Sequence, residues 1–399
     1  MFINKPRLFE RMKRENLDAV VATSPENVTY SSGFWPMSQW IRRGPQNYVL
    51  IPREGQGELC IVASTGLIDL IADRVFDIDV SVSDVHRYGL FAVTTEPSAK
   101  LDGAEQRLHS MLAEDDYGDA VTALVAAIKK RDLHRSRLGV DDLGILPVYW
   151  DKLCDALPDA TIVRSTALFR HARAVKTEIE IERLRRVAKI AELSIEAALA
   201  VANEGATEID MALAFHGATI REGGMPVLGC IAAGPHTAFA NVQPSSRKIR
   251  SGDIIRFDVG GRFNHYRADI ARNAVIGEPS KKFAAYHRAV RAGLLRAIEM
   301  TKPGARASDI FERTVETVRR EGLSHYQRNH VGHGIGLDGY DAPDFSPSSD
   351  EVLEENMIIC LETPYYEIGF GGLQVEDMIR VTRDGAETLM TTSSELRIL

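Results

Sequence analysis

Cysteine is scarce in this sequence, and other marks of specialised proteins are missing. The 399 residues include four cysteines, which are widely spaced and form no CxxC pair. Neither a dense disulfide framework nor a structural zinc knot is therefore expected, and a reducing cytoplasm fits best. No apolar run approaches the roughly 20 residues that cross a bilayer, and the N-terminal segment lacks the hydrophobic stretch of a signal peptide. The sequence predicts a soluble, cytoplasmic protein without a membrane partner.

The sequence also lacks an excess of positive charge and several common nucleotide-binding and hydrolase motifs. The net charge of −8 argues against nucleic acid as the main partner. There is no P-loop and no GxSxG elbow. Hydrophobic residues make up 44% and charged residues 26%, a mixture typical of globular proteins with a substantial core. These absences leave a small-molecule substrate open.

The first part of the chain alternates predicted helices and strands. We expect helices at 7–15, 118–131 and 147–157, and strands at 19–22, 47–51, 59–63 and 138–140. This alternation predicts an α/β layer domain over residues 1–165.

A different pattern begins at Thr177. Thr177 and Glu180 have the T-x-x-E spacing of a capping box, which predicts the start of a helix. Apolar residues then recur at three- and four-residue steps, as on one face of a long helix: Ile181, Leu184, Ala188, Ala191 and Ile195. The segment 172–177 is the predicted boundary, and the second domain is expected to span residues 172–399.

The second part contains an internal repeat. Each unit opens with a Gly-Ala pair whose alanine is four residues before an aspartate, and it closes with Arg-Glu-Gly. The units start at Gly205 and Gly304, 99 residues apart, and close at 221–223 and 320–322. Two unrelated helices with similar capping signals are the alternative. Two similar half-units predict a pseudo-twofold α+β domain with its site near the axis.

Four carboxylates occupy matching positions after the two units. The pattern IIRFDVGG places Asp258 in a half-buried strand, and a glycine turn returns the chain through 266–274 with Asp269. Glu362 and Glu376 follow the second unit in the same way. Four unpaired, partly buried carboxylates would repel one another, whereas two divalent ions roughly 3.5–4 Å apart can share them and polarise a carbonyl. Solvated or arginine-paired carboxylates are the alternative.

A fifth ligand candidate, His333, lies between two glycines. Small neighbours allow close approach to a crowded site. Imidazole beside carboxylates suits Mn, Co, Zn or Fe better than Ca or Mg. His330 is the other plausible ligand or proton carrier. We therefore predict two divalent metal ions (Mn, Zn or Co) bound by Asp258, Asp269, His333, Glu362 and Glu376.

Taken together, these motifs resemble a known family. FDVGG, RADIARN, GHGIGLD, LETPYY and VEDMIRVT, in this order between about Lys176 and Val381, resemble the pita-bread metallopeptidases: prolidase, aminopeptidase P, methionine aminopeptidase and their non-metal relative creatinase. NVTYSSGF at 27–34 resembles the smaller N-terminal domain of prolidase, aminopeptidase P and creatinase. The resemblance implies an α/β N-terminal domain and a pita-bread C-terminal domain. It matches the five candidate ligands one for one, a set that creatinase does not keep.

Three positions depart from the peptidase pattern. Where prolidases carry histidines, this chain has Asn241, Asn329 and Tyr340. Asn and Tyr can donate hydrogen bonds to an oxyanion, but neither shuttles protons readily at neutral pH. His236 and His330 lie nearby in the sequence and are candidates to compensate. The alternative is that they are surface or packing histidines.

These features predict a binuclear metal-dependent hydrolase of a C–N amide or imide bond. The resemblance favours an Xaa-Pro dipeptidase or aminopeptidase-like activity on a dipeptide. Glu362 is expected to take a proton from the attacking nucleophile and pass it to the leaving nitrogen. The other candidate catalytic residues are His330, His236, Asn241 and Tyr340. The alternatives are a hydrolase of a non-peptide compatible solute or guanidino compound, a lyase with the same metals, and a catalytically silent binding protein.

The resemblance also implies an assembly. An aromatic and basic segment contains Trp35, Trp40, Arg42 and Arg43. In the family this region reaches toward a partner's active site, although such residues more often pack a loop. We therefore expect a homodimer in which one N-terminal domain closes the other subunit's site.

Overall fold

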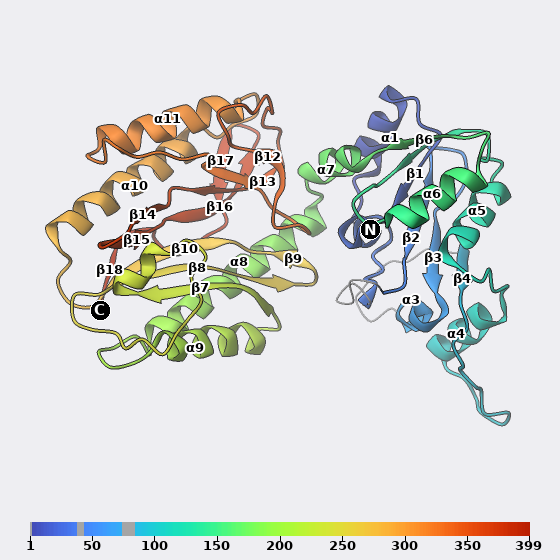
Figure 1. Ribbon diagram of the computed structural model, residues 1–399, viewed down its shortest axis with the longest axis horizontal. Helices are drawn as coiled ribbons and strands as arrows, with labels where there is room; N and C mark the ends of the chain where they lie inside the picture. Colours follow the sequence, from blue (N-terminus) through green and yellow to red (C-terminus); the bar gives the residue numbers. More distant parts are fainter. Residues whose placement is uncertain (1, 38–43, 74–83) are drawn as a thin grey trace. The chain divides into compact units, whose positions relative to one another are not determined.

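The protein consists of two compact units. The computed structural model describes residues 2–37, 44–73 and 84–399 (Figure 1). The division falls after Arg173, giving the units Met1–Arg173 and Ala174–Leu399. Each unit has its own hydrophobic core. Of the segment expected to reach a partner's site, Trp40, Arg42 and Arg43 lie outside the described residues.

The N-terminal unit is built on a mixed six-stranded sheet with the strand order β4-β3-β2-β1-β5-β6. Its strands are β1 (Ala19–Ala22), β2 (Tyr48–Pro52), β3 (Cys60–Ser64), β4 (Asp84–Tyr88), β5 (Arg137–Val140) and β6 (Thr161–Arg164). Its helices are α1 (Lys5–Arg14), α2 (Pro25–Ser32), η2 (Thr65–Leu67), α3 (Ile68–Asp73), α4 (Gly103–Ala113), α5 (Ala120–Lys130), α6 (Pro147–Ala156) and α7 (Thr166–Ala174). β1 pairs antiparallel with β2 and parallel with β5.

Apolar content explains which of these elements the sequence predicted. The AVVA segment of β1 is buried at every position, as a continuous apolar run in a central strand should be. α5 presents a largely apolar face to the sheet and supplies much of the core. β4 was not predicted, because its sequence DVHRY is mostly polar. It forms a strand because it pairs in parallel with β3 along all five residues.

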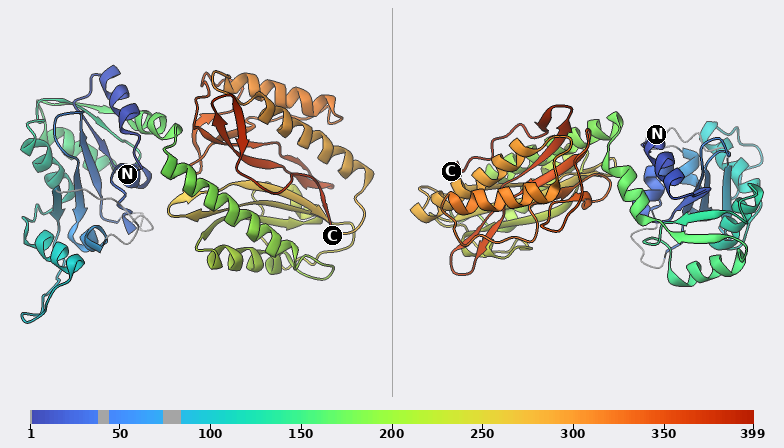
Figure 2. Two further views of the ribbon diagram at one scale, coloured as in Figure 1. Left: turned by 180° about the vertical axis from the view of Figure 1, so that it is seen from behind. Right: turned by 90° about the horizontal axis from the view of Figure 1, so that it is seen from above.

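The C-terminal unit contains a ten-stranded sheet that lies between two helix pairs (Figures 1 and 2). The main strand order is β12-β11-β13-β16-β10-β8-β7, and β9, β17 and β18 pair at its sides. The helices are α8 (Glu178–Leu199), α9 (Glu208–Arg221), η3 (Gly234–Ala238), α10 (Lys281–Met300) and α11 (Ala307–Arg320). The strands are β7 (Met225–Ala233), β8 (Ile254–Phe263), β9 (Tyr266–Arg267), β10 (Ile270–Val275), β11 (Gly332–Gly334), β12 (Asp341–Asp344), β13 (Ile358–Glu362), β14 (Tyr365–Glu367), β15 (Gly371–Leu373), β16 (Glu376–Thr382), β17 (Gly385–Thr388) and β18 (Arg397–Ile398).

The predicted start of α8 is confirmed. The Glu180 carboxylate accepts a hydrogen bond from the Thr177 backbone N–H at 2.8 Å, so the first turn is capped as the T-x-x-E spacing indicated. The apolar stripe from Ile181 to Ile195 is buried. Although α8 has 22 residues, no helix within the described ranges is long and apolar enough to cross a membrane.

The internal repeat is visible in the backbone. α9 and α11 each contain 14 residues and are offset by the 99 positions seen in the sequence. Gly205 donates its backbone N–H to Ile249 O at 2.9 Å, and Gly304 donates to Leu353 O at 2.9 Å. Both acceptor residues return a hydrogen bond to the alanine after the glycine. The predicted pseudo-twofold fold is therefore confirmed, and the halves meet where β10 pairs with β16.

Candidate metal centre

The carboxylates predicted as ligands lie on adjacent central strands. Asp258 of β8 pairs with Ala271 of β10, and Ala271 pairs with Glu376 of β16. Glu376 in turn pairs with Glu362 of β13. Residues directly opposite each other on neighbouring strands project from the same face. One row across four strands therefore carries three acids, and Ala271 occupies only the volume of a methyl group between them.

Asp269 reaches this row from a turn. The strand predicted over 266–274 is interrupted, and Asp269 lies one residue before β10. A Cβ atom at Gly260 would lie 1.9 Å from Ala268 O, so only glycine permits this approach of the two backbones. As a result, Asp269 joins Asp258 and Glu376 with ligand oxygens that all lie within 4.8 Å of one another.

The positions on either side of His333 require glycine for the same reason as position 260, because a neighbouring backbone approaches too closely for a Cβ atom. A Cβ atom at Gly332 would lie 2.2 Å from Cys360 O, and one at Gly334 would lie 2.0 Å from Ala342 O. β11 is therefore held tightly between β13 and β12. The predicted close approach is present, and the backbones of the neighbouring strands cause it.

A backbone contact orients the His333 ring toward the carboxylates. Its Nδ1 lies 3.0 Å from Gly334 O, so this nitrogen donates and Nε2 keeps its lone pair. Nε2 lies 4.0 Å from Asp269 Oδ2. His333, Cys360 and Glu376 also place ligand atoms within 4.8 Å of one another. The structure thus brings all five predicted ligands to one region, with the Cys360 thiol beside them.

The donor set fits divalent cations. The side chains of Asp258 and Asp269 are 17% and 15% exposed, and the two glutamates are buried. Burial, together with the neighbouring negative charges, raises the pKa of Asp269 and Glu376 well above the usual range and that of Glu362 to about 7. Asp269 Oδ1 and Glu376 Oε1 are buried without a hydrogen-bond partner in the described chain. Because unpartnered buried charge is costly, these carboxyl groups hold a proton when no cation is bound, and a cation beside them would favour the ionised form.

Two residues outside the predicted site connect its carboxylates. Gln374 donates from Nε2 to Glu362 Oε2 and to Glu376 Oε2, each at 3.2 Å. Its Oε1 accepts from the guanidinium of Arg256 at 3.1 Å. Arg256 is fully buried, and its NH1 also lies 3.3 Å from Asp258 Oδ2. The pair therefore links acids from both half-units.

Arg256 also fixes the loop after η3. Its NH2 donates to Phe239 O at 2.7 Å and to Ala240 O at 2.9 Å. The hydroxyl of Tyr366, on β14, donates to Gln374 Oε1 at 2.9 Å. The strand alternation did place Arg256 on the same face as Asp258, but no local signal indicates its contact with a glutamine 118 residues away.

Two of the predicted catalytic side chains lie at the centre. His330 Nδ1 lies 3.2 Å from Glu362 Oε1, although the contact lacks hydrogen-bond geometry. Burial and the charge of Arg328 lower the pKa of His330. The Tyr340 ring stacks on His333 with centroids 4.0 Å apart. His330 therefore lies beside Glu362, and the Tyr340 ring lies against His333.

The other predicted residues make no hydrogen bond to these carboxylates among the described residues. His236 Nδ1 lies 2.8 Å from the buried carboxylate of Glu208, on α9. Asn241 and Asn329 are exposed, and neither makes a hydrogen bond to any described residue. His236 therefore belongs to a separate contact with Glu208.

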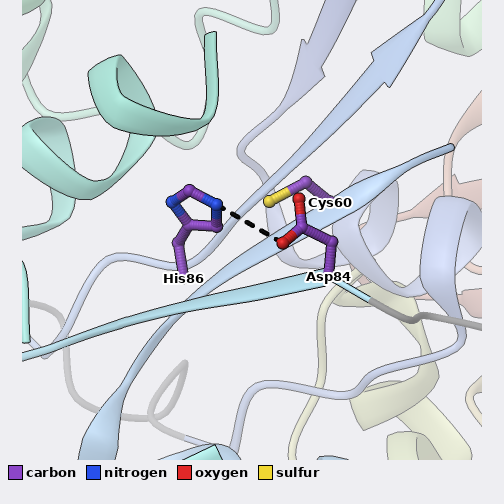
Figure 3. A group of neighbouring side chains, drawn as sticks. All are labelled: Cys60, Asp84 and His86. Atoms are coloured by element: carbon purple, nitrogen blue, oxygen red, sulfur yellow. Dashed lines mark ion pairs between the residues drawn. The ribbon is translucent and has the colours of Figure 1, made fainter. Parts of the chain in front are cut away.

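A second group of metal-type ligands lies in the N-terminal unit, where Cys60, Asp84 and His86 project from β3 and β4 (Figure 3). His86 Nε2 lies 3.5 Å from Asp84 Oδ1, and Lys130 and Arg131 lie within 2.9 and 2.7 Å of the same carboxylate. Together, the hydrogen bond to His86 and these two cations hold the pKa of Asp84 far below its usual value. Its charge is already compensated, so we assign no metal here.

The centre defines a class of protein: a two-unit, pseudo-twofold metalloenzyme with its donor set on mirrored hairpins. The metallopeptidase family M24 matches residues 182–383, and the creatinase/prolidase N-terminal domain matches residues 6–175. The M24 match covers just over half of the chain. The chain therefore belongs to metallopeptidase family M24, which implies the use of divalent metal, and the predicted family, fold and enzyme class are confirmed.

Individual relatives agree with this assignment. An Xaa-Pro dipeptidase of Pyrococcus furiosus is 31% identical over 57% of this chain and 66% of its own length. One from Pyrococcus horikoshii is 30% identical over 68% of this chain and 80% of its own length. In fold, the chain is similar to an Xaa-Pro dipeptidase from Bacillus anthracis, with a TM-score of 0.81 and 22% identity over 99% and 98% of the two chains. A prolidase from Pyrococcus horikoshii gives a TM-score of 0.77 and 23% identity over 98% of each chain.

Proposed function

We propose that this chain is an Xaa-Pro dipeptidase-like hydrolase that uses two divalent ions, Mn, Zn or Co. The observation that carries the proposal is the row of acids with unpartnered buried oxygens. The proposed ligands are Asp258, Asp269, His333, Glu362 and Glu376. Relatives named Xaa-Pro dipeptidase support the substrate class.

The surrounding residues fit the chemistry of amide hydrolysis. When bound, such ions polarise the scissile carbonyl and lower the pKa of water. Burial raises the pKa of Glu362 to about 7 while no metal is bound, and Glu362 is the proposed general base. It takes a proton from the attacking water and returns it to the leaving nitrogen. His330, beside Glu362 Oε1, is the second proposed proton carrier of the site.

Metal content tests the proposal directly. Chelation should abolish activity, and Asp269→Asn or Glu376→Gln should lower bound metal below two ions per chain, as measured by elemental analysis. Glu387→Gln is the matched control, because Glu387 is a half-exposed acid on the neighbouring strand β17 that pairs with Arg185. Absence of metal after reconstitution with Mn or Zn would refute the proposal.

A substrate panel separates the related functions. Hydrolysis of Xaa-Pro dipeptides supports the dipeptidase, whereas cleavage of non-peptide amides alone supports the second candidate, a solute amidohydrolase. The exposed Asn241 and Asn329, which stand at the places of prolidase histidines, favour that second candidate. Bound metal without turnover of any panel member would indicate a silent binding protein.

We also propose a homodimer in the cytoplasm. The dimer rests on the family resemblance and on the segment around Trp35. All four cysteines are unpaired, which supports a reducing compartment. A monomer in light scattering at assay concentrations would refute the dimer.

A further inference from the structure

The Cys360 thiol lies inside the candidate metal centre, and the proposed reaction does not use it. Cys360 stands two residues before Glu362 on β13, so both side chains project from the same face of the strand. Its backbone pairs with His333 of β11. The residue is fully buried, and its Sγ lies 3.9 Å from Asp269 O. The sulfur atom is therefore enclosed by residues that carry the proposed ligands.

Two groups of potential ligand atoms meet at Glu376. In the first group, Asp258, Asp269 and Glu376 offer oxygen atoms alone. In the second group, His333, Cys360 and Glu376 offer a nitrogen, a sulfur and an oxygen atom. The ligand atoms of each group all lie within 4.8 Å of one another. Glu376 is 1% exposed, and its Oε1 has no hydrogen-bond partner in the described chain. The two groups therefore share a carboxylate with a vacant acceptor but differ in the kind of atom that they offer.

The two half-units differ at the position that Cys360 occupies. Arg256 precedes Asp258 by two residues in the first half-unit. Cys360 stands at the same distance before Glu362, which mirrors Asp258 in the second. Arg256 NH1 lies 3.3 Å from Asp258 Oδ2, so a fixed positive charge accompanies the oxygen group. A guanidinium cannot bind a metal cation, whereas a thiol can. The second half-unit thus places a potential metal ligand where the first has a cation.

The kind of donor atom decides which ion each group prefers. Sulfur from cysteine is a soft ligand that favours zinc, and imidazole also suits zinc, whereas carboxylate oxygens suit magnesium and manganese. Zinc binds sulfur at about 2.3 Å and imidazole nitrogen at about 2.0–2.1 Å. Two such atoms on one tetrahedral ion are then roughly 3.6 Å apart. Side-chain shifts of about 1 Å would therefore close the spacing of at most 4.8 Å seen between His333 and Cys360.

We propose that Cys360 is a sulfur ligand to the ion beside His333 and makes that ion zinc or cobalt rather than manganese. The presence of an ion rests on the proposed function, and the sulfur atom adds to the five ligands proposed there. When the ion binds, the sulfur forms its metal bond as a thiolate, and the thiol proton leaves to solvent. The oxygen group of Asp258, Asp269 and Glu376 has no such preference and accepts manganese.

Cobalt reports directly on sulfur ligation. A bond between Co²⁺ and a thiolate adds an intense near-ultraviolet charge-transfer band, which nitrogen and oxygen ligands do not give. The metal-depleted full-length chain should develop this band during titration with Co²⁺, and Cys360→Ser should bind cobalt without it. Cys230→Ser and Cys60→Ser are the matched controls. Cys230 is a buried thiol on β7 that pairs with Asp258, and Cys60 belongs to the group in the N-terminal unit. Both controls should keep the band.

Metal competition and X-ray absorption supply independent readouts. Loss of a group that only orients a metal ligand typically costs about 10–100-fold in metal affinity. Cys360→Ser should therefore weaken zinc binding by at least about tenfold in a chelator competition and leave manganese binding within twofold of the wild type. X-ray absorption at the zinc edge of the wild-type protein should show one sulfur neighbour at about 2.3 Å. This measurement needs no variant, so the proposal stays testable if Cys360→Ser does not fold.

Each outcome bears on Cys360 or on the proposed function separately. Two bound ions with no cobalt–sulfur band and no sulfur neighbour of zinc would overturn the Cys360 assignment and leave the proposed function intact. A band that persists in Cys360→Ser, or that disappears in Cys230→Ser or Cys60→Ser, would also overturn it, because the sulfur would then come from another residue. If the band depends on Cys360 but no Xaa-Pro dipeptide is cleaved, the proposed substrate class fails while the sulfur ligand stands.

Discussion

Replacing Gln374 with methionine should weaken metal binding without touching any proposed ligand. Gln374 donates to Glu362 and Glu376 and accepts from Arg256 and Tyr366. Methionine has a similar volume but none of these hydrogen-bonding groups. The two glutamates would lose the donor that holds them in register, and Arg256 would lose one acceptor.

The magnitude follows from the number and kind of these contacts. Loss of a residue that orients metal ligands typically costs about 10–100-fold in metal affinity, or ~1.4–2.7 kcal/mol. The effect should lie near the upper end, because two charged acceptors lose the same donor and Gln374 is only 2% exposed. A chelator competition titration with Mn or Zn measures this change without reference to activity.

Gln243 supplies the matched control. Its side chain donates to the carbonyl of its own neighbour Val242, so Gln243→Met removes an amide without touching the carboxylates. Its metal affinity should equal that of the wild type. An affinity of Gln374→Met within twofold of the wild type would refute the idea that Gln374 positions the acids.

Two further predictions concern pH and specificity. Burial raises the pKa of Glu180 from 4.5 to about 7, so the folded chain holds a proton that the unfolded chain releases between these values. The free energy of unfolding should fall by about 3 kcal/mol as pH rises through this window. Denaturant titrations at pH 5 and 8 measure this change, and Glu180→Gln should lose it. An equal change in the wild type and in Glu180→Gln would contradict the prediction. Without the prolidase histidines, Gly-Pro and Ala-Pro should be poor substrates by roughly ten- to hundredfold per lost contact. Asn241→His with Tyr340→His should raise their hydrolysis and lower that of the natural substrate. Wild-type kcat/KM of about 10⁵ M⁻¹s⁻¹ or more on these dipeptides would show that the departures do not matter.

Local signals were sufficient where one interaction dominates. The apolar run at Ala19–Ala22 could only be a buried strand, and Thr177 with Glu180 defined a capped helix start. The tertiary fold overrode propensity at β4, where pairing with β3 outweighs a polar sequence. A tertiary contact also explains why Asp269 lies outside its predicted strand. The close approach of Ala268 to Gly260 interrupts the strand pattern.

The sequence by itself determined the repeat, the mirrored acids and the Gly-flanked His333, because symmetry and spacing are properties of the chain. Only the tertiary structure decided which residues surround those acids. Gln374 and Arg256 meet across 118 positions, and Arg328 stands beside Glu362, while His236 is turned to Glu208. These contacts depend on strand register and on charge compensation in a buried row. Neither can be read from neighbouring residues, since the partners become neighbours only when the sheet forms.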